Sequence, residues 1–152
     1  MQDGTQLLGY SIFDGLTGSV VVSGEVSALS SGASLSWAGF TDKCALSIMD
    51  SDGMLSMLAR YPGSSYSCNG NWMPLLDTVG LRKNMNDTFW PCEVHGGKLI
   101  CVPLRGRDYP DATRRPVTTA LSLRIPLATG LTSKRYDTSL IIRQLNFANT
   151  VF

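Results

Sequence analysis

The sequence predicts an all-β fold made of short antiparallel strands. Apolar or alternating runs of about five to ten residues recur along the chain, separated by turn residues. The 15 glycines and 7 prolines supply those turns. A composition of 43% hydrophobic and 16% charged residues excludes an intrinsically disordered chain. The apolar runs are too short for a membrane-spanning helix, and 152 residues amount to one domain or part of one.

Five strands are expected in the first half, over residues 7–13, 19–23, 34–40, 44–49 and 54–60. The first ends at the turn Asp14-Gly15. The last two are separated only by Asp50-Ser51-Asp52-Gly53. Since Asp-Gly supplies the positive φ that tight turns favour, these two strands are predicted to form a hairpin.

Four strands are expected in the second half, over residues 72–76, 88–94, 98–104 and 118–127. Pro74 places the first of them at a sheet edge or a bulge, because proline has no N–H to donate. His95-Gly96-Gly97 predicts a second tight hairpin. The segments 62–71, 79–87 and 105–117 are polar and predict loops.

The pattern changes after Gly130. Leu140, Ile141 and Leu145 recur at roughly helical spacing, which predicts a helix over residues 133–152. Ser133 or Asp137 is the candidate N-cap.

The strand count leaves a sandwich, a barrel and a propeller open. A propeller blade takes four strands in about 40–45 residues, so about ten strands fill two and a half blades. A closed propeller needs about four or more blades, and on that interpretation the chain is part of a domain.

The charge is unevenly distributed, although the net charge is only +1. Residues 1–60 carry six acids against two bases, and residues 61–152 carry six acids against eleven bases. The bases cluster at Arg105, Arg107, Arg114 and Arg115. This cluster suits an acidic partner or a phosphate. The alternative is a solvated loop, because Asp108 and Asp111 lie among the arginines.

Four cysteines stand at positions 44, 68, 92 and 101, too few for a disulfide scaffold. Residues 1–10 lack the pattern of a signal peptide, which favours reduced thiols. Cys44 and Cys101 lie within apolar alternating runs and are predicted to be buried.

Catalytic motifs are lacking in the sequence. Neither a G-x-S-x-G elbow nor a glycine-rich phosphate loop occurs, and His95 is the single histidine. Cys92, His95 and Cys101 lack the paired spacing of a zinc site. We therefore predict no catalytic residue, no metal site, no cofactor and no enzyme. A small hydrolase around Cys92, His95 and either Asp87 or Glu93 is the minor alternative.

Tryptophans 37, 72 and 90 each lie in a strand-like run. They are predicted to pack in the core rather than to stack on bases, and Met49, Met54 and Met57 are interpreted in the same way.

An ordered series of short motifs identifies a family. The series runs through Leu35-Ser-Trp-Ala-Gly-Phe40, Asp50-Ser-Asp-Gly-Met-Leu55, Trp72-Met-Pro-Leu-Leu-Asp-Thr78, Phe89-Trp90, Leu99-Ile-Cys-Val-Pro-Leu-Arg-Gly106, Tyr109-Pro110 and Arg114-Arg-Pro116. It resembles the second β-propeller of the chromosome transmission fidelity factor four family, which includes the WD-repeat and HMG-box DNA-binding proteins. The resemblance is strongest over residues 33–127. Its structural motif residues are Trp37, Gly39, Phe40, Asp50, Ser51, Gly53, Trp72, Pro74, Asp77, Thr78, Trp90, Cys101, Gly106, Pro110, Arg115 and Pro116.

The resemblance implies a fold and a domain organisation. It predicts an all-β, partial WD40-like propeller of about two to three blades out of six, followed by the start of a C-terminal helix. Residues 1–130 would be the C-terminal part of the second propeller, and residues 131–152 the truncated start of the helical domain. The N-terminal WD40 array and the HMG box of the family have no counterpart here, so we expect a fragment, a partial gene model or a truncated paralogue.

The resemblance also implies a function. The family's second propeller forms a homotrimer, and its members are non-enzymatic replisome scaffolds in the nucleus. They couple the replicative helicase to DNA polymerase α–primase at chromatin and support sister-chromatid cohesion. No membrane is implied. The alternative function is a nucleic-acid-binding β-domain that uses the basic loop from Arg105 to Arg115, with Tyr109 nearby.

Overall fold

The computed structural model describes residues 8–59, 71–111 and 115–123. These residues form nine strands and a short 3-10 turn, η1 (Val79–Leu81), with no α-helix among them. The strands are β1 (Gly9–Phe13), β2 (Val20–Glu25), β3 (Leu35–Phe40), β4 (Leu46–Asp50), β5 (Met54–Ala59), β6 (Asn71–Asp77), β7 (Asp87–His95), β8 (Lys98–Arg105) and β9 (Thr119–Ser122). The prediction of an all-β fold is confirmed.

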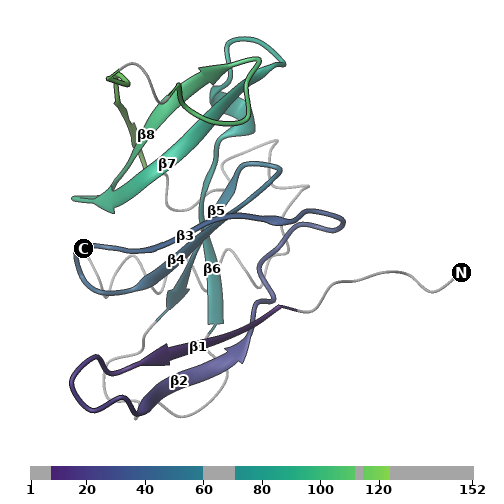
Figure 1. The fold of residues 1–152 in the computed structure, drawn as a ribbon. Helices are drawn as coiled ribbons and strands as arrows, with labels where there is room; N and C mark the ends of the chain where they lie inside the picture. Colours follow the sequence, from purple (N-terminus) through teal and green to yellow (C-terminus); the bar gives the residue numbers. More distant parts are fainter. Residues whose placement is uncertain (1–7, 60–70, 112–114, 124–152) are drawn as a thin grey trace, which may run out of the picture.

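The strands build three antiparallel sheets, which follow one another in space as they do in sequence (Figure 1). Their strand orders are β1-β2, β3-β4-β5-β6 and β7-β8-β9, so within each sheet the strands pair in the order of the sequence. A four-stranded meander such as β3–β6 is the unit of a propeller blade. The chain is therefore part of a propeller, with one four-stranded sheet between two smaller ones.

Two apolar clusters pack the sheets together. One lies between the β3–β6 and β7–β9 sheets and includes Leu55, Leu75 and Leu99, each at most 1% exposed. The other lies between the β3–β6 and β1–β2 sheets and is formed around Ile48 and Trp72. Both faces of the middle sheet are thus buried, which explains why β5 is buried continuously from Leu55 to Ala59 instead of alternating between buried and exposed residues.

Glycine sets the two predicted hairpin turns. Gly53 has φ +92° between β4 and β5, and Gly96 and Gly97 have φ +54° and +69° between β7 and β8. Both hairpins are confirmed. Pro74 lies on β6, an edge strand of its sheet, and faces Ser56 next to a register shift. Pro74 therefore lies both on an edge strand and beside a bulge, the two placements that the sequence predicted as alternatives.

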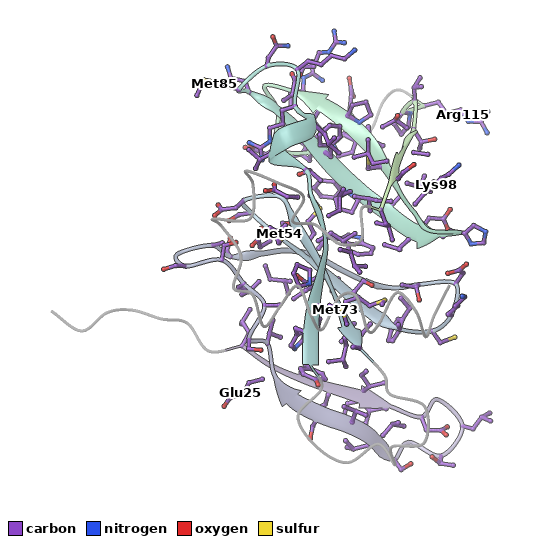
Figure 2. The ribbon with its side chains drawn as sticks, turned by 180° about the vertical axis from the view of Figure 1, so that it is seen from behind. Glu25, Met54, Met73, Met85, Lys98 and Arg115 are labelled. Atoms are coloured by element: carbon purple, nitrogen blue, oxygen red, sulfur yellow. The ribbon has the colours of Figure 1, made fainter. Side chains whose placement is uncertain are left out.

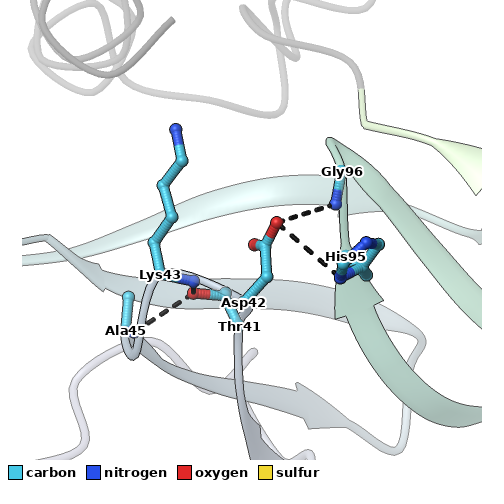
Figure 3. Close-up of polar contacts among 6 residues, drawn as sticks. All are labelled: Thr41, Asp42, Lys43, Ala45, His95 and Gly96. Atoms are coloured by element: carbon cyan, nitrogen blue, oxygen red, sulfur yellow. Dashed lines mark hydrogen bonds and ion pairs between the residues drawn. The ribbon is translucent and has the colours of Figure 1, made fainter.

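A clasp of backbone and side-chain contacts joins the middle sheet to the β7–β8 hairpin. Thr41 forms a parallel bridge with Val94, and the Asp42 amide donates to the Val94 carbonyl at 3.2 Å. The Asp42 carboxylate accepts a hydrogen bond from the Gly96 amide at 3.1 Å (Figure 3). This bond holds the pKa of the Asp42 carboxyl below its usual range, and His95, 3.8 Å away, lowers it further.

Two expectations about side-chain burial were wrong. Cys44 is exposed because it lies in the β3–β4 turn with φ +58°, and β4 begins only at Leu46. Trp90 is 40% exposed and lines a cleft of about 230 Å³ instead of joining a core cluster. Cys101 is buried as predicted.

The remaining differences concern the ends of elements. The last strand is shorter than expected, since β9 ends at Ser122 and Leu123 is outside it. The segment 79–87 begins with η1. The predicted loop at 62–71 falls almost wholly outside the described residues, and the predicted helix at 133–152 does so entirely.

Candidate functional site

Three arginines of the predicted basic cluster line one open hollow of about 490 Å³. Arg105 ends β8, and Arg107 and Arg115 lie in the connection to β9. Prolines 103, 110 and 116 and Val117 form part of its wall. Arg114 lies outside the described residues.

The chain turns into this hollow directly after β8. Gly106 has φ +63°, and its amide donates to the Asn86 carbonyl at 3.0 Å. Thr88 on β7 donates its hydroxyl to the Arg107 carbonyl at 3.3 Å. The start of the connection is therefore tied to the segment before β7 and to β7 itself.

The charge of the hollow is positive and local. Among the described residues, three arginines and Asp111 are the charged groups that line it, a formal balance of +2. Arg107 lies 3.8 Å from the Asp111 carboxylate, with side chains 65% and 37% exposed. Such surface pairs contribute little, so the guanidinium stays available to a partner. In Figure 2, Arg115 extends outward at the margin of the β7–β9 sheet.

A second hollow of about 530 Å³ lies beside the first. It is lined by Arg107, Asp108, Tyr109, Pro110 and Asp111. The two carboxylates end the basic surface on this side. Tyr109 is 70% exposed, in a position to contact a partner.

Asp87, one of the two candidate acids of a hydrolase, is not brought to His95, because the two residues stand at opposite ends of β7. His95 has Asp42 as its charged neighbour, and Cys92 makes a weak contact from its thiol to the Trp90 carbonyl at 3.9 Å. Asp87 accepts the Asn84 amide at the far end of β7 from His95. Among the described residues, no three His, Cys, Asp or Glu side chains are grouped as metal ligands.

The Cys101 thiol is unsuited to attack a substrate. It is fully buried, and burial raises the pKa of its thiol to about 11, with a smaller contribution from Cys92. A thiol with such a pKa stays protonated near neutral pH and is a poor nucleophile.

Within the described part of the chain, no helix is long and apolar enough to cross a membrane.

Several of the family-motif residues build the turn between β4 and β5. Asp50 is 2% exposed, and its carboxylate accepts the Met54 amide at 2.8 Å and the Ser30 amide at 3.1 Å. Thr78 donates its hydroxyl to the Gly53 carbonyl at 2.8 Å. Ser51 accepts the Ser34 amide at 3.1 Å.

Other motif residues order neighbouring segments. Asp77 accepts a hydrogen bond at 3.0 Å from the amide of Val79, the first residue of η1. Trp72 donates its indole N–H to the Glu25 carbonyl at 3.1 Å. Gly39 lies against the Trp37 indole so closely that a β-carbon there would collide with it.

Phe40 and Pro110 are further motif positions, the first 55% exposed at the end of β3.

The clasp at Asp42 was not predicted from the sequence. Its signal is only one acid in a turn, and its partner lies 54 residues away.

Comparisons with known proteins match most of the chain. Residues 1–127 match the family described as Minichromosome loss protein, Mcl1, middle region. Protein ENHANCER OF LHP1 1 of Arabidopsis thaliana is 30% identical over 81% of this chain and 12% of its own length. WD repeat and HMG-box DNA-binding protein 1 of Homo sapiens is 28% identical over 87% of this chain and 11% of its own.

Minichromosome loss protein 1 of Schizosaccharomyces pombe is 31% identical over 99% of this chain and 18% of its own length. The chain thus spans less than a fifth of each of these relatives. The resemblance drawn from the short motifs is confirmed. The chain belongs to the family of minichromosome loss protein middle regions, together with the WD repeat and HMG-box DNA-binding proteins.

Proposed function

We propose that the chain is a non-catalytic scaffold module of a nuclear DNA replication factor. In this role it helps to couple the replicative helicase to DNA polymerase α–primase at chromatin, and it supports sister-chromatid cohesion. The observation that carries the proposal is the family match over residues 1–127. The names of the relatives, which refer to minichromosome loss and to DNA binding, support a role on chromosomes.

The architecture suits such a role. Face-to-face packing of the three sheets gives a rigid body, and its loops and strand ends remain available to partners. Assembly as a homotrimer belongs to the same proposal. In a trimer, several copies of each docking surface would raise the effective concentration of the bound enzymes.

Cross-linking mass spectrometry on the full-length protein tests this function. Replication complexes are purified from S-phase chromatin after nuclease treatment, which removes bridging by DNA. Lys83 and Lys98 are exposed and report contacts made by this chain. We expect cross-links from these lysines to helicase or polymerase subunits and between copies of the chain. Recovery of the protein as a monomer without either enzyme would refute the proposal.

A further inference from the structure

We propose that the hollow lined by Arg105, Arg107 and Arg115 docks one phosphorylated serine or threonine of a partner protein. The inference rests on the proposed scaffold function, because it names the chemistry by which one partner is held. Phosphorylation of the partner would then regulate its attachment to the scaffold.

The charge of the hollow matches a single phosphoryl group. The part of its lining that the structure describes has a formal balance of +2, from three arginines and Asp111. A phosphorylated side chain carries about −1.5 to −2 charges at pH 7 and three strong acceptor oxygens. One such group would neutralise the hollow, and every arginine could donate to it.

The kind of base also favours a phosphoryl group. All four bases between residues 104 and 117 are arginines, and none is a lysine. The guanidinium fork matches phosphate oxygens in a bidentate way, whereas a lysine acts as a point charge. Shape-dependent recognition of one group thus accounts for the composition better than general attraction to anions does.

The walls are suited to a peptide. Pro110 and Pro116 line the hollow and restrict the backbone there, and Val117, which also lines it, is 82% exposed. A restricted backbone loses less conformational freedom when a ligand binds. The apolar surface of Val117 could cover an apolar residue that flanks the phosphorylated one.

The surroundings argue against a nucleic acid. A strand of DNA or RNA carries a phosphate at every nucleotide and needs a continuous basic track. Here Asp108 and Asp111 line the adjacent hollow and would repel the next phosphates. A single phosphorylated residue meets one carboxylate, that of Asp111, among three arginines.

The test uses the full-length protein and two peptide libraries. Both are randomised around a fixed central residue, which is phosphoserine in one and serine in the other. We expect enrichment of peptides from the phosphoserine library only. The best peptide is then titrated by fluorescence anisotropy against the Arg105→Ala, Arg107→Ala and Arg115→Ala variants. Each should bind about tenfold more weakly, because each loses a charge-assisted hydrogen bond.

Lys98→Ala is the matched control. Lys98 is the first residue of β8 and Arg105 is the last, so the Lys98→Ala substitution removes one positive charge at a distance from the hollow. It should leave affinity within about twofold. Arg115→Lys keeps the charge but loses the fork, and should bind more weakly than the parent protein.

Three results would overturn the inference: no preference for phosphoserine over serine, equal weakening by Lys98→Ala, or equally tight binding of a decathymidylate that the same arginine variants abolish. The last result would assign the hollow to nucleic acid. The cross-links of Lys83 and Lys98 to replication enzymes are read separately. If the full-length protein binds the phosphopeptide but these cross-links are not found, the scaffold function alone is refuted.

Discussion

Replacement of Asp50 by alanine should loosen the β4–β5 hairpin specifically. The Asp50 carboxylate is 2% exposed and accepts two backbone N–H groups, from Met54 and Ser30. A hydrogen bond to a charged group contributes about 1.5–3 kcal/mol. Water entering the vacated space recovers part of the loss, so we take the lower value for each bond. The expected destabilisation is about 3 kcal/mol.

Hydrogen exchange on the full-length protein measures this effect locally. Because about 1.4 kcal/mol corresponds to a factor of ten, amides of β4 and β5 should exchange about a hundredfold faster in Asp50→Ala. Asp52→Ala is the matched control, since Asp52 lies in the same turn but is exposed. Exchange in Asp50→Ala that stays within about threefold of the parent protein would refute this reasoning.

Three further changes have distinct expected outcomes. Leu55→Ala empties a site that is 0% exposed and should destabilise the protein by about 2–5 kcal/mol, measured by urea unfolding; a loss below about 1 kcal/mol would contradict the packing. Trp72→Phe removes the indole donor to the Glu25 carbonyl and should speed exchange in β2 more than in β8, whereas equal effects would show no local role. At a pH above its unfolded-state pKa of about 4, the ionised Asp42 carboxylate stabilises the clasp. Because its pKa is lowered in the folded state, this contribution is lost as the pH falls through that lower pKa. The Gly96 amide resonance should follow that titration in NMR spectra, and Asp42→Asn should abolish it.

The hairpins and the edge strand could be predicted because their signals are local. Gly53 and Gly96 each supply a backbone conformation that other residues rarely adopt, and Pro74 lacks a donor wherever it stands. The arginines of the hollow are close in sequence, so their convergence needed only one loop. The short motifs identified the family because their order and spacing are specific.

Other features do not follow from the pattern of apolar and polar residues. Cys44 follows the apolar pattern of a strand but adopts a left-handed conformation in a turn, which the pattern does not reveal. Trp90 has the residue type of a core position, yet it faces a cleft between sheets. The contact of Asp42 with Gly96 arises only when two sheets come together. Tertiary packing decides Trp90 and Asp42, whereas the local β3–β4 turn, in which the Cys44 amide donates to the Thr41 carbonyl, decides Cys44.

The doubly buried middle sheet also affects how this sequence can evolve. On β5, Leu55 and Met57 belong to one interface, and Leu58 belongs to the other. On β1, by contrast, exposed and half-buried residues alternate, so every second position can drift. Because β5 has no solvent side, a substitution that improves one interface shifts the backbone shared with the other. We therefore expect substitutions to be tolerated in the loops more than in β5, which sets the spacing between the two flanking sheets.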